Sequence, residues 1–389
     1  MPATVRSFAK VNLGLSIGAA RDDGFHELLT VYQTIGLHDL IGVSVERGRG
    51  IEIRCADVRV PKDESNTCYR IVEMAMVAMK SKGRVTIDIE KRLPVQGGMG
   101  GASSNAVAAV VGLEHVMKKK LASEERLRIA AEVGSDLPLF LVGGTVLGVG
   151  RGEQVYPLED LPAMACVVVT PEMGVSTPKA FAEWDRRMAG GLQGLQPAFS
   201  RDSDAALKRR SSTFGPTFDP TVDEGFVQNA ELRSARTGKS ARPHTGSAQL
   251  LREKLTVGKA SDRMAVLGRE LSAWLSESYS GAPRRQFGEL RGRAGNPLLE
   301  LVRAGIKNDF EEVVFPEYPE LSEVKNALER AGAKYASLSG SGSTLYGLFA
   351  SKDAAGAAVK KLRRQRWAAQ ATATMTRREY WRKFLVSSF

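Results

Sequence analysis

A glycine-rich stretch, Pro94–Asn105, joins a predicted strand to a predicted helix, and this arrangement limits what the chain can become. Alternating apolar residues precede it at Val85–Glu90, and apolar residues at helical spacing follow it at Ala106–Met117. Its four glycines let the backbone take positive φ and approach a ligand closely, and a serine or asparagine at its end can open the helix. The free N–H groups and the dipole of a helix start favour an anion, so the stretch predicts a polyphosphate site.

Two common phosphate motifs do not match this stretch. No Lys-Ser or Lys-Thr pair follows the glycines, as a Walker loop requires, and Ser103 stands where a dinucleotide fingerprint has its third glycine. A glycine turn before an ordinary helix would use the same residue types. The stretch alone therefore leaves both a phosphate site and a plain turn open.

Length and composition favour a soluble protein of two domains. The 389 residues contain 43% hydrophobic residues, enough for sizeable cores. The chain has three cysteines, an odd number, at Cys55, Cys68 and Cys166. They are far apart in the sequence, which argues against a disulfide framework or a zinc site. The N-terminus lacks the pattern of a signal peptide, and no apolar run approaches membrane-spanning length. We expect a cytoplasmic protein that does not bind membranes.

Most of the net charge of +11 lies in one middle segment. Residues 186–295 contain 19 Lys/Arg against 11 Asp/Glu, a net charge of +8, and much of the segment is rich in Ser, Arg, Gly and Pro. Such a composition predicts a basic, flexible insertion at residues 187–295. Scattered arginines and few aromatic residues favour a solvated loop over a nucleic-acid site, although nucleic-acid binding stays an alternative.

Three other patterns each allow a structural and a functional explanation. The strand predicted at Phe8–Ile17 alternates, so Lys10 and Asn12 share one face, which is either solvated or lines a site. Asp136 stands in a turn before an apolar run and is either a structural cap or a functional carboxylate. The small residues of Ser339–Thr344 form either a tight hairpin or a ligand loop.

Taken together, these blocks resemble the GHMP kinase superfamily of small-molecule kinases. The resemblance is carried by Ala9–Leu13, Pro94–Asn105 and Ser339–Ser343, in that order. Four further blocks are similar to the family of 4-diphosphocytidyl-2-C-methyl-D-erythritol kinases of the non-mevalonate isoprenoid pathway: Asp23–Leu28, Gly134–Leu141, Gly148–Glu153 and Asn308–Glu311. The resemblance covers about residues 5–185 and 296–376, and family members usually lack the middle segment.

The resemblance implies an α+β fold of two lobes, the GHMP kinase fold. Its N-terminal domain would be similar to ribosomal protein S5, and its C-terminal domain would be a ferredoxin-like α/β sandwich. We expect the ATP-binding domain at residues 1–162 and the second domain at residues 163–389, interrupted by the insertion.

The resemblance also implies an activity, the ATP-dependent phosphorylation of a hydroxyl of 4-diphosphocytidyl-2-C-methyl-D-erythritol. Asp136 matches the catalytic aspartate of the family, and Lys10 matches the lysine that works beside it. Because an alcohol is a weak nucleophile, an aspartate within reach can accept its proton as the bond to the γ-phosphorus forms. The lysine would keep that carboxylate ionised and offset charge on the phosphoryl group.

ATP and Mg²⁺ are the expected nucleotide and ion. The residues that resemble ATP contacts lie near the adenine, in the glycine loop and in a loop that closes the cleft: Asn66, Pro94, Gly97, Gly98, Met99, Gly100, Gly101, Ala102, Ser103, Ser104, Gly340, Ser341 and Gly342. Because Mg²⁺ keeps much of its water and takes few protein ligands, one hydroxyl, that of Ser104, is the expected protein contact.

The family places the cytosine of the acceptor between two aromatic rings, and Phe25 and Phe181 occupy those positions here. Family members commonly have tyrosine in place of Phe25. His26 matches the residue that reads the cytosine edge, and Asn12 would contact the methylerythritol end. With Pro178 at the start of a predicted helix, these residues make up the expected acceptor site.

Two alternatives stay open at this stage. Another GHMP kinase, acting on homoserine, mevalonate or a sugar, would share the nucleotide motifs but not the cytosine residues. A nucleic-acid-binding protein on a kinase-like scaffold would instead use the basic middle segment. We expect a small-molecule substrate, no nucleic acid, and a monomer or weak homodimer.

Overall fold

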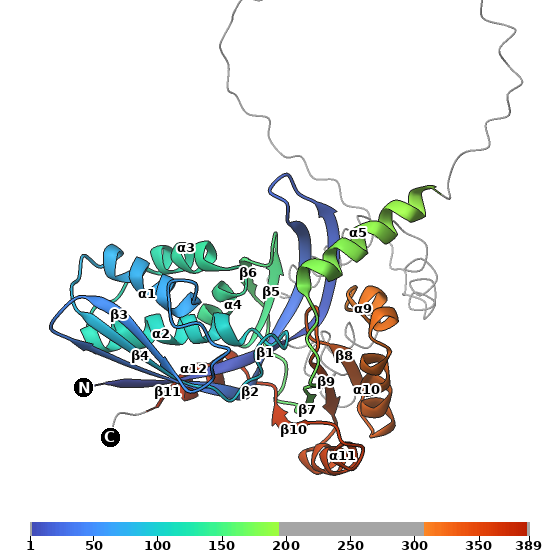
Figure 1. Cartoon of the computed structure of the whole chain (residues 1–389). Coiled ribbons are helices and arrows are strands. Elements are labelled where there is room, and N and C mark those ends of the chain that lie inside the picture. Colours follow the sequence, from blue (N-terminus) through green and yellow to red (C-terminus); the bar gives the residue numbers. More distant parts are fainter. Residues whose placement is uncertain (1, 194–306, 387–389) are drawn as a thin grey trace, which may run out of the picture.

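The structure of the protein is a computed structural model that describes residues 2–193 and 307–386, with the backbone alone for residues 189–193 (Figure 1). Two sheets with their covering helices lie side by side in Figure 1, which agrees with the predicted α+β fold of two lobes. Most of the predicted insertion at residues 187–295 lies outside the described residues. Within the described ranges, no helix is both long and apolar enough to cross a membrane.

The first sheet contains seven strands in the order β11-β1-β2-β4-β3, with β5 paired to β2 and β6 paired to β5. Its strands are β1 (Ala3–Ala20), β2 (His26–Glu46), β3 (Gly50–Cys55), β4 (Arg84–Glu90), β5 (Thr145–Val149), β6 (Gln154–Pro157) and β11 (Leu385–Val386). β2 is one long strand, because it continues through register shifts where it pairs with β1.

Helices cover this sheet and bury its apolar face (Figure 1). They are α1 (Thr67–Ala78), α2 (Gly101–Met117), α3 (Ser123–Val133), α4 (Leu137–Val142) and, from the end of the chain, α12 (Arg377–Phe384). The helix after the glycines begins at Gly101, earlier than a cap at Ser103, Ser104 or Asn105 would place it. Gly100 in the left-handed conformation precedes it, so no side chain is needed to end the loop.

The second sheet has the order β10-β7-β9-β8 and packs against its own helices. Its strands are β7 (Ala165–Val169), β8 (Tyr335–Leu338), β9 (Leu345–Phe349) and β10 (Ala369–Ala373). The helices of this lobe are α5 (Thr177–Gln193), α9 (Glu311–Glu317), α10 (Pro319–Arg330) and α11 (Lys352–Arg364). α5 therefore continues past Arg187, where the insertion was predicted to begin.

Strand β1 connects the lobes because its side chains enter all three apolar cores. Phe8 packs under the helices of the first sheet, Val11 packs between the two sheets, and Ile17 packs in the core of the second lobe. Register shifts against β2 between Phe8 and Ala9 and between Asn12 and Gly14 change which residues face each core.

The end of the chain returns to the first sheet. β11 extends the sheet beside β1, with Thr4 opposite Val386, and the buried Tyr380 and Phe384 of α12 pack into the core of the first lobe. The described end of the chain is thus a basic, aromatic helix followed by a short strand. The division into consecutive domains at residues 1–162 and 163–389 stays a prediction.

Candidate active site

Lys10 and Asp136 face each other although they are far apart in the sequence. The Nζ atom of Lys10 lies 3.4 Å from Oδ2 of Asp136. The lysine side chain is buried, whereas 31% of the aspartate side chain is exposed. The pair thus combines a fixed cation with a carboxylate that a substrate hydroxyl can reach.

The carboxylate of Asp136 does not serve the helix that it precedes. The residue stands at the start of α4, yet its side chain makes no capping hydrogen bond to that helix. Pro138 follows in the first turn, where proline is well tolerated. The structural explanation of this aspartate as a cap therefore fails, and its side chain remains available for chemistry.

Polar side chains of β1 and β2 hold Lys10 in place. Its Nζ donates to Oδ1 of Asn12 at 2.7 Å, and Nδ2 of Asn12 donates to Oγ1 of Thr30 at 2.8 Å. The hydroxyl of Tyr32 donates to Oδ1 of Asp136 at 3.1 Å. Lys10 and Asn12 are both almost fully buried, so the polar face of the strand lines a site and is not a solvated surface.

The glycine loop lies directly beside Lys10. The backbone N–H of Lys10 donates to the carbonyl oxygen of Met99 at 3.0 Å. Gly100 has φ +68°, and a Cβ atom there would lie 2.8 Å from the ring of Phe140 and 3.1 Å from Cγ of Lys10. No side chain caps the first N–H groups of α2, which leaves them free to bind an anion.

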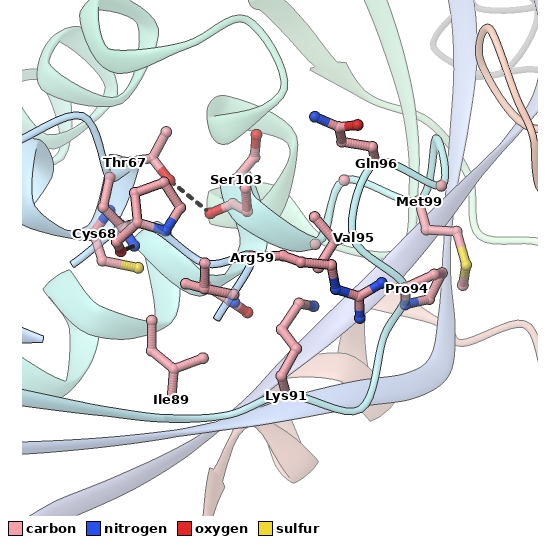
Figure 2. Close-up of a pocket in the computed structure, with 18 of the residues that line it drawn as sticks. Arg59, Thr67, Cys68, Ile89, Lys91, Pro94, Val95, Gln96, Met99 and Ser103 are labelled. Carbon is pink, nitrogen blue, oxygen red and sulfur yellow. Dashed lines mark hydrogen bonds between the residues drawn. The ribbon is translucent and has the colours of Figure 1, made fainter. Parts of the chain in front are cut away.

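A pocket of about 330 Å³ opens between this loop, the start of α1 and the end of β4 (Figure 2). Of the glycine-loop residues predicted to bind ATP, those from Pro94 to Ser103 line it and Ser104 does not; Asn66 lines it as well. Asn66 begins α1, where its side chain accepts from the N–H of Cys68 and donates to the carbonyl oxygen of Pro61. Apolar walls and uncapped N–H groups in one pocket suit a nucleotide with a phosphate tail.

Two basic side chains reach into the same pocket in Figure 2. Arg59 pairs with the carboxylate of Asp57, and Nζ of Lys91 lies 2.6 Å from Oδ2 of the fully buried Asp39. The other oxygen of Asp39 accepts from the backbone N–H groups of Arg92 and Leu93. Lys91 carries no local sequence signal, because its neighbour across the sheet, Asp39, is distant in the chain.

The second small-residue loop meets the first. The hydroxyl of Ser339 donates to the carbonyl oxygen of Gly98 at 3.0 Å, and the N–H of Thr344 donates to that of Gly97 at 3.3 Å. A Cβ atom at Gly340 would lie 3.7 Å from Nζ of Lys10. Ser341 bonds through its hydroxyl to Thr177 at the start of α5. The loop therefore joins β8 to β9 as a hairpin and also borders the site.

Ser104 does not suit the expected contact with magnesium. Its hydroxyl is fully buried, donates to the carbonyl oxygen of Phe8 at 2.7 Å and lies 2.7 Å from Oγ of Ser7. It points into the core and does not line the pocket, whereas its neighbour Ser103 does (Figure 2). Because the helix begins at Gly101, Ser104 lies on its inner face.

The residues expected to bind the acceptor gather where the β1–β2 hairpin meets α5. Nε2 of the buried His26 lies 2.7 Å from Oδ1 of Asp185, and its ring stacks on Phe181 with centroids 4.7 Å apart. Phe25 is half exposed and stacks beneath the guanidinium of Arg151 at 4.9 Å.

The expected pair of rings around cytosine is not assembled in this structure. Among the described ring pairs, Phe181 contacts His26 and Phe310, and none joins it to Phe25. Pro178 is exposed in the first turn of α5. The structure thus brings His26 and Phe181 together, with Phe25 and Pro178 exposed beside them in the sequence.

Known proteins resemble this chain in sequence. The model of the GHMP kinases N terminal domain matches residues 66–144, and that of the GHMP kinases C terminal matches residues 289–369. A 4-diphosphocytidyl-2-C-methyl-D-erythritol kinase of Solibacter usitatus (strain Ellin6076) is 30% identical over 360 residues, which cover 92% of this chain and 85% of the relative. One of Rhodococcus jostii (strain RHA1) is 41% identical over 214 residues, 53% of this chain and 69% of the relative.

Solved structures share the fold. A crystal structure of 4-(cytidine 5'-diphospho)-2C-methyl-D-erythritol kinase superposes with a TM-score of 0.59 at 24% identity, covering 96% of this chain and 99% of that chain. A mevalonate kinase of L. major in complex with R-mevalonate has a TM-score of 0.57 at 14% identity, covering 96% of each chain. At these identities the superpositions establish the fold, while the sequence matches establish the relationship. The chain is a GHMP kinase and belongs to the family of 4-diphosphocytidyl-2-C-methyl-D-erythritol kinases.

Proposed function

We propose that this kinase transfers the γ-phosphoryl group of ATP to a hydroxyl of 4-diphosphocytidyl-2-C-methyl-D-erythritol, in the non-mevalonate route to isoprenoids. The observation that carries the proposal is the approach of Lys10 Nζ to within 3.4 Å of Asp136 Oδ2, beside two small-residue loops. Family membership supplies the reaction class and the acceptor.

Asp136 acts as the general base in this proposal. Its exposed carboxylate accepts the proton of the attacking hydroxyl as that oxygen bonds to the γ-phosphorus and the bond to the β-γ bridging oxygen breaks. Lys10 keeps the carboxylate ionised and opposes the negative charge on the transferred group. Both groups are held by neighbouring strands, so little reorganisation is needed during the reaction.

The nucleotide occupies the pocket beneath the glycine loop. Its adenine lies near Asn66 and its phosphates lie against the free N–H groups at the start of α2. Lys91 and Arg59 contribute positive charge in the same pocket. Gly340 and Ser341 border the phosphate end from the second lobe.

Mg²⁺ would neutralise charge on the β- and γ-phosphates when bound with ATP. Over residues 2–193 and 307–386 no group of three His, Cys, Asp or Glu side chains could hold a metal ion. A site with few protein ligands suits an ion that keeps most of its water and binds phosphate oxygens. Ser103 replaces Ser104 as the proposed hydroxyl contact, because it lines the pocket.

The acceptor binds at the junction of the β1–β2 hairpin with α5. Cytosine stacks on Phe25 or Phe181, His26 donates to or accepts from its edge, and Pro178 borders the site. Asn12, whose side chain accepts a hydrogen bond from Lys10, directs the methylerythritol end of the acceptor toward the general base, Asp136. Stacking alone is worth on the order of 1–3 kcal/mol per base and tolerates base identity, so the histidine supplies the choice of cytosine.

The test is a coupled assay of ADP release with this alcohol, with the phosphorylated product identified by mass spectrometry. Asp136→Asn and Lys10→Met should each lower kcat by about 100-fold or more, the range of general acid–base and charge-stabilising effects. Asp88→Asn, at an exposed position of β4, is the matched control and should retain activity. Homoserine, mevalonate and galactose serve as competing acceptors. Turnover of one of them in preference, or full activity of Asp136→Asn, would count against the proposal.

A further inference from the structure

We propose that Tyr32 is a positioning residue for the catalytic carboxylate and that two glycines of the β5–β6 hairpin are required to seat it. The inference rests on the proposed function, since it assigns Tyr32 to the orientation of the general base Asp136. The hairpin, Gly148–Glu153, is a conspicuous sequence motif that the proposed reaction does not otherwise use.

Tyr32 is tied to the site by its place in the sheet. It lies opposite Asn12 of β1 and opposite Val146 of β5, with 2% of its surface exposed. Residues that face each other across antiparallel strands share one face, so its side chain points the same way as those of Asn12 and Lys10. At the end of that side chain, the hydroxyl donates to Oδ1 of Asp136 at 3.1 Å.

The glycines make room for the ring and for its hydroxyl. A Cβ atom at Gly148 would lie 2.5 Å from Cε2 of Tyr32, and one at Gly152 would lie 2.4 Å from its hydroxyl oxygen. Real Cβ contacts are never so short, so either side chain would displace the tyrosine. The N–H of Leu28 donates to the carbonyl oxygen of Gly150 at 2.6 Å, which holds the hairpin tip against β2.

Tyr32 and Lys10 hold the two oxygens of one carboxylate. Tyr32 contacts Oδ1, and Nζ of Lys10 lies 3.4 Å from Oδ2. Two fixed contacts on different oxygens define the plane of the carboxylate, and each oxygen retains a lone pair for the substrate hydroxyl. Two other charged groups lie near Tyr32: Nζ of Lys10 lies 5.4 Å from the centroid of its ring, and Glu153, within the hairpin turn, is a second nearby carboxylate.

The phenol is a permanent donor in this environment. Burial, followed by the charge of Asp136, raises the pKa of Tyr32 well above its ordinary value of 10. It therefore keeps its proton throughout the working range of the enzyme. A neutral donor stabilises the ionised form of the carboxylate without competing for its proton.

The first experiment is Tyr32→Phe, which removes only the hydroxyl. We expect kcat to fall about tenfold with the KM for ATP unchanged. The second readout does not need turnover: the ¹³C chemical shift of the Asp136 carboxyl at a fixed pH, assigned with Asp136→Asn, should change because the hydrogen bond from the phenol is lost.

Two alanine variants test the role of the hairpin. Gly152→Ala places its Cβ against the hydroxyl, and the next nearest atom of Tyr32 is 3.6 Å away, so Tyr32→Phe should cancel most of its effect on kcat. Gly148→Ala meets the ring itself, so the same second substitution should not rescue it. Gly152 has φ +96°, and Gly50→Ala, at φ +101° in open space, controls for backbone strain alone.

These experiments distinguish a failure of the proposed function from a failure of the role assigned to Tyr32. If the wild type does not phosphorylate the cytidine acceptor, the proposed function fails, while the NMR shift of the Asp136 carboxyl still decides the role of Tyr32. An unchanged carboxyl chemical shift in Tyr32→Phe overturns the positioning role, whatever the assay shows. Equal effects of Gly152→Ala with and without the hydroxyl overturn the assignment of the hairpin.

Discussion

A Cβ atom at Gly98 would lie 2.2 Å from the carbonyl oxygen of Ser339, so the loops of the two lobes meet where no side chain fits. Gly98 also has φ +73°, a conformation that side chains disfavour. Gly98 therefore has to be glycine both for its backbone conformation and for its contact with Ser339. This lets the phosphate loop and the Ser339–Thr344 loop lie close together.

Gly98→Ala should therefore separate the loops. We expect a fall of at least tenfold in kcat/KM for ATP, because a displacement of about 1 Å in a positioned site can cost that much or more. Gly356→Ala is the control. It lies within α11 with open space around it, so it should leave kinetics unchanged and raise the free energy of unfolding by about 0.5–1 kcal/mol. Wild-type kinetics in Gly98→Ala would contradict the expected close approach.

Ser103 and Ser104 should respond differently to the same substitution. Ser103→Ala removes a hydroxyl from the pocket, so we expect half-maximal activity to require several-fold more Mg²⁺, with stability unchanged. Ser104→Ala leaves the buried carbonyl oxygen of Phe8 without its donor and should cost about 1–3 kcal/mol of stability. Titrating Mg²⁺ in the assay and unfolding each variant in urea separates the two effects. The reverse pattern would restore Ser104 as the proposed metal contact.

The contrast between these serines shows where sequence reasoning ends. The glycine loop, its flanking strand and its helix were predictable, because alternation, helical spacing and glycine content are local signals. The orientation of the helix was not predictable. α2 is apolar almost all round, so no polar stripe indicates which of its residues face the core. The helix starts at Gly101, three residues before a cap at Ser103 would start it, and in this helix Ser103 faces the pocket whereas Ser104 faces the core.

Contacts between side chains on neighbouring strands could not be predicted from the sequence either. The resemblance to known kinases indicated Lys10 and Asp136, and the structure brings them together. Tyr32 and the pair of Lys91 with Asp39 depend on register between distant segments, which a single sequence does not contain. The return of α12 to the first sheet is likewise a long-range contact.

Asp39→Ala should be the most destabilising of the carboxylate substitutions in the first lobe outside the catalytic pair. It would leave the largely buried ammonium of Lys91 unpaired and remove the acceptor of two backbone N–H groups. Breaking a buried pair from one side typically costs about 3–5 kcal/mol. Glu125→Ala, which breaks an exposed pair with Arg128, should cost less than about 1 kcal/mol. Chemical unfolding of both variants measures the difference, and similar losses would contradict the importance of burial.

Stability should decline at alkaline pH because of two buried thiols. Burial raises the pKa of Cys68 and of Cys166 to about 12, whereas the thiol of an unfolded chain has a value near 9.0. Between these values the unfolded chain loses protons that the folded chain keeps. The unfolded state then binds fewer protons, so the free energy of unfolding falls as pH rises.

The expected slope is about 1.4 kcal/mol per pH unit for each thiol once the pH exceeds 9. Urea unfolding at pH 8, 9 and 10 measures it. The buried tyrosines, whose pKa values are also raised, add to the slope near pH 10 in the wild type and the control alike. The control is the double variant with Cys68→Ala and Cys166→Ala, which should lose most of the slope although its stability at pH 8 is lower. Only the change with pH is compared, so a packing defect of the variant does not affect the result. Parallel curves for the wild type and the double variant would show that these thiols ionise equally in both states, which their burial does not allow.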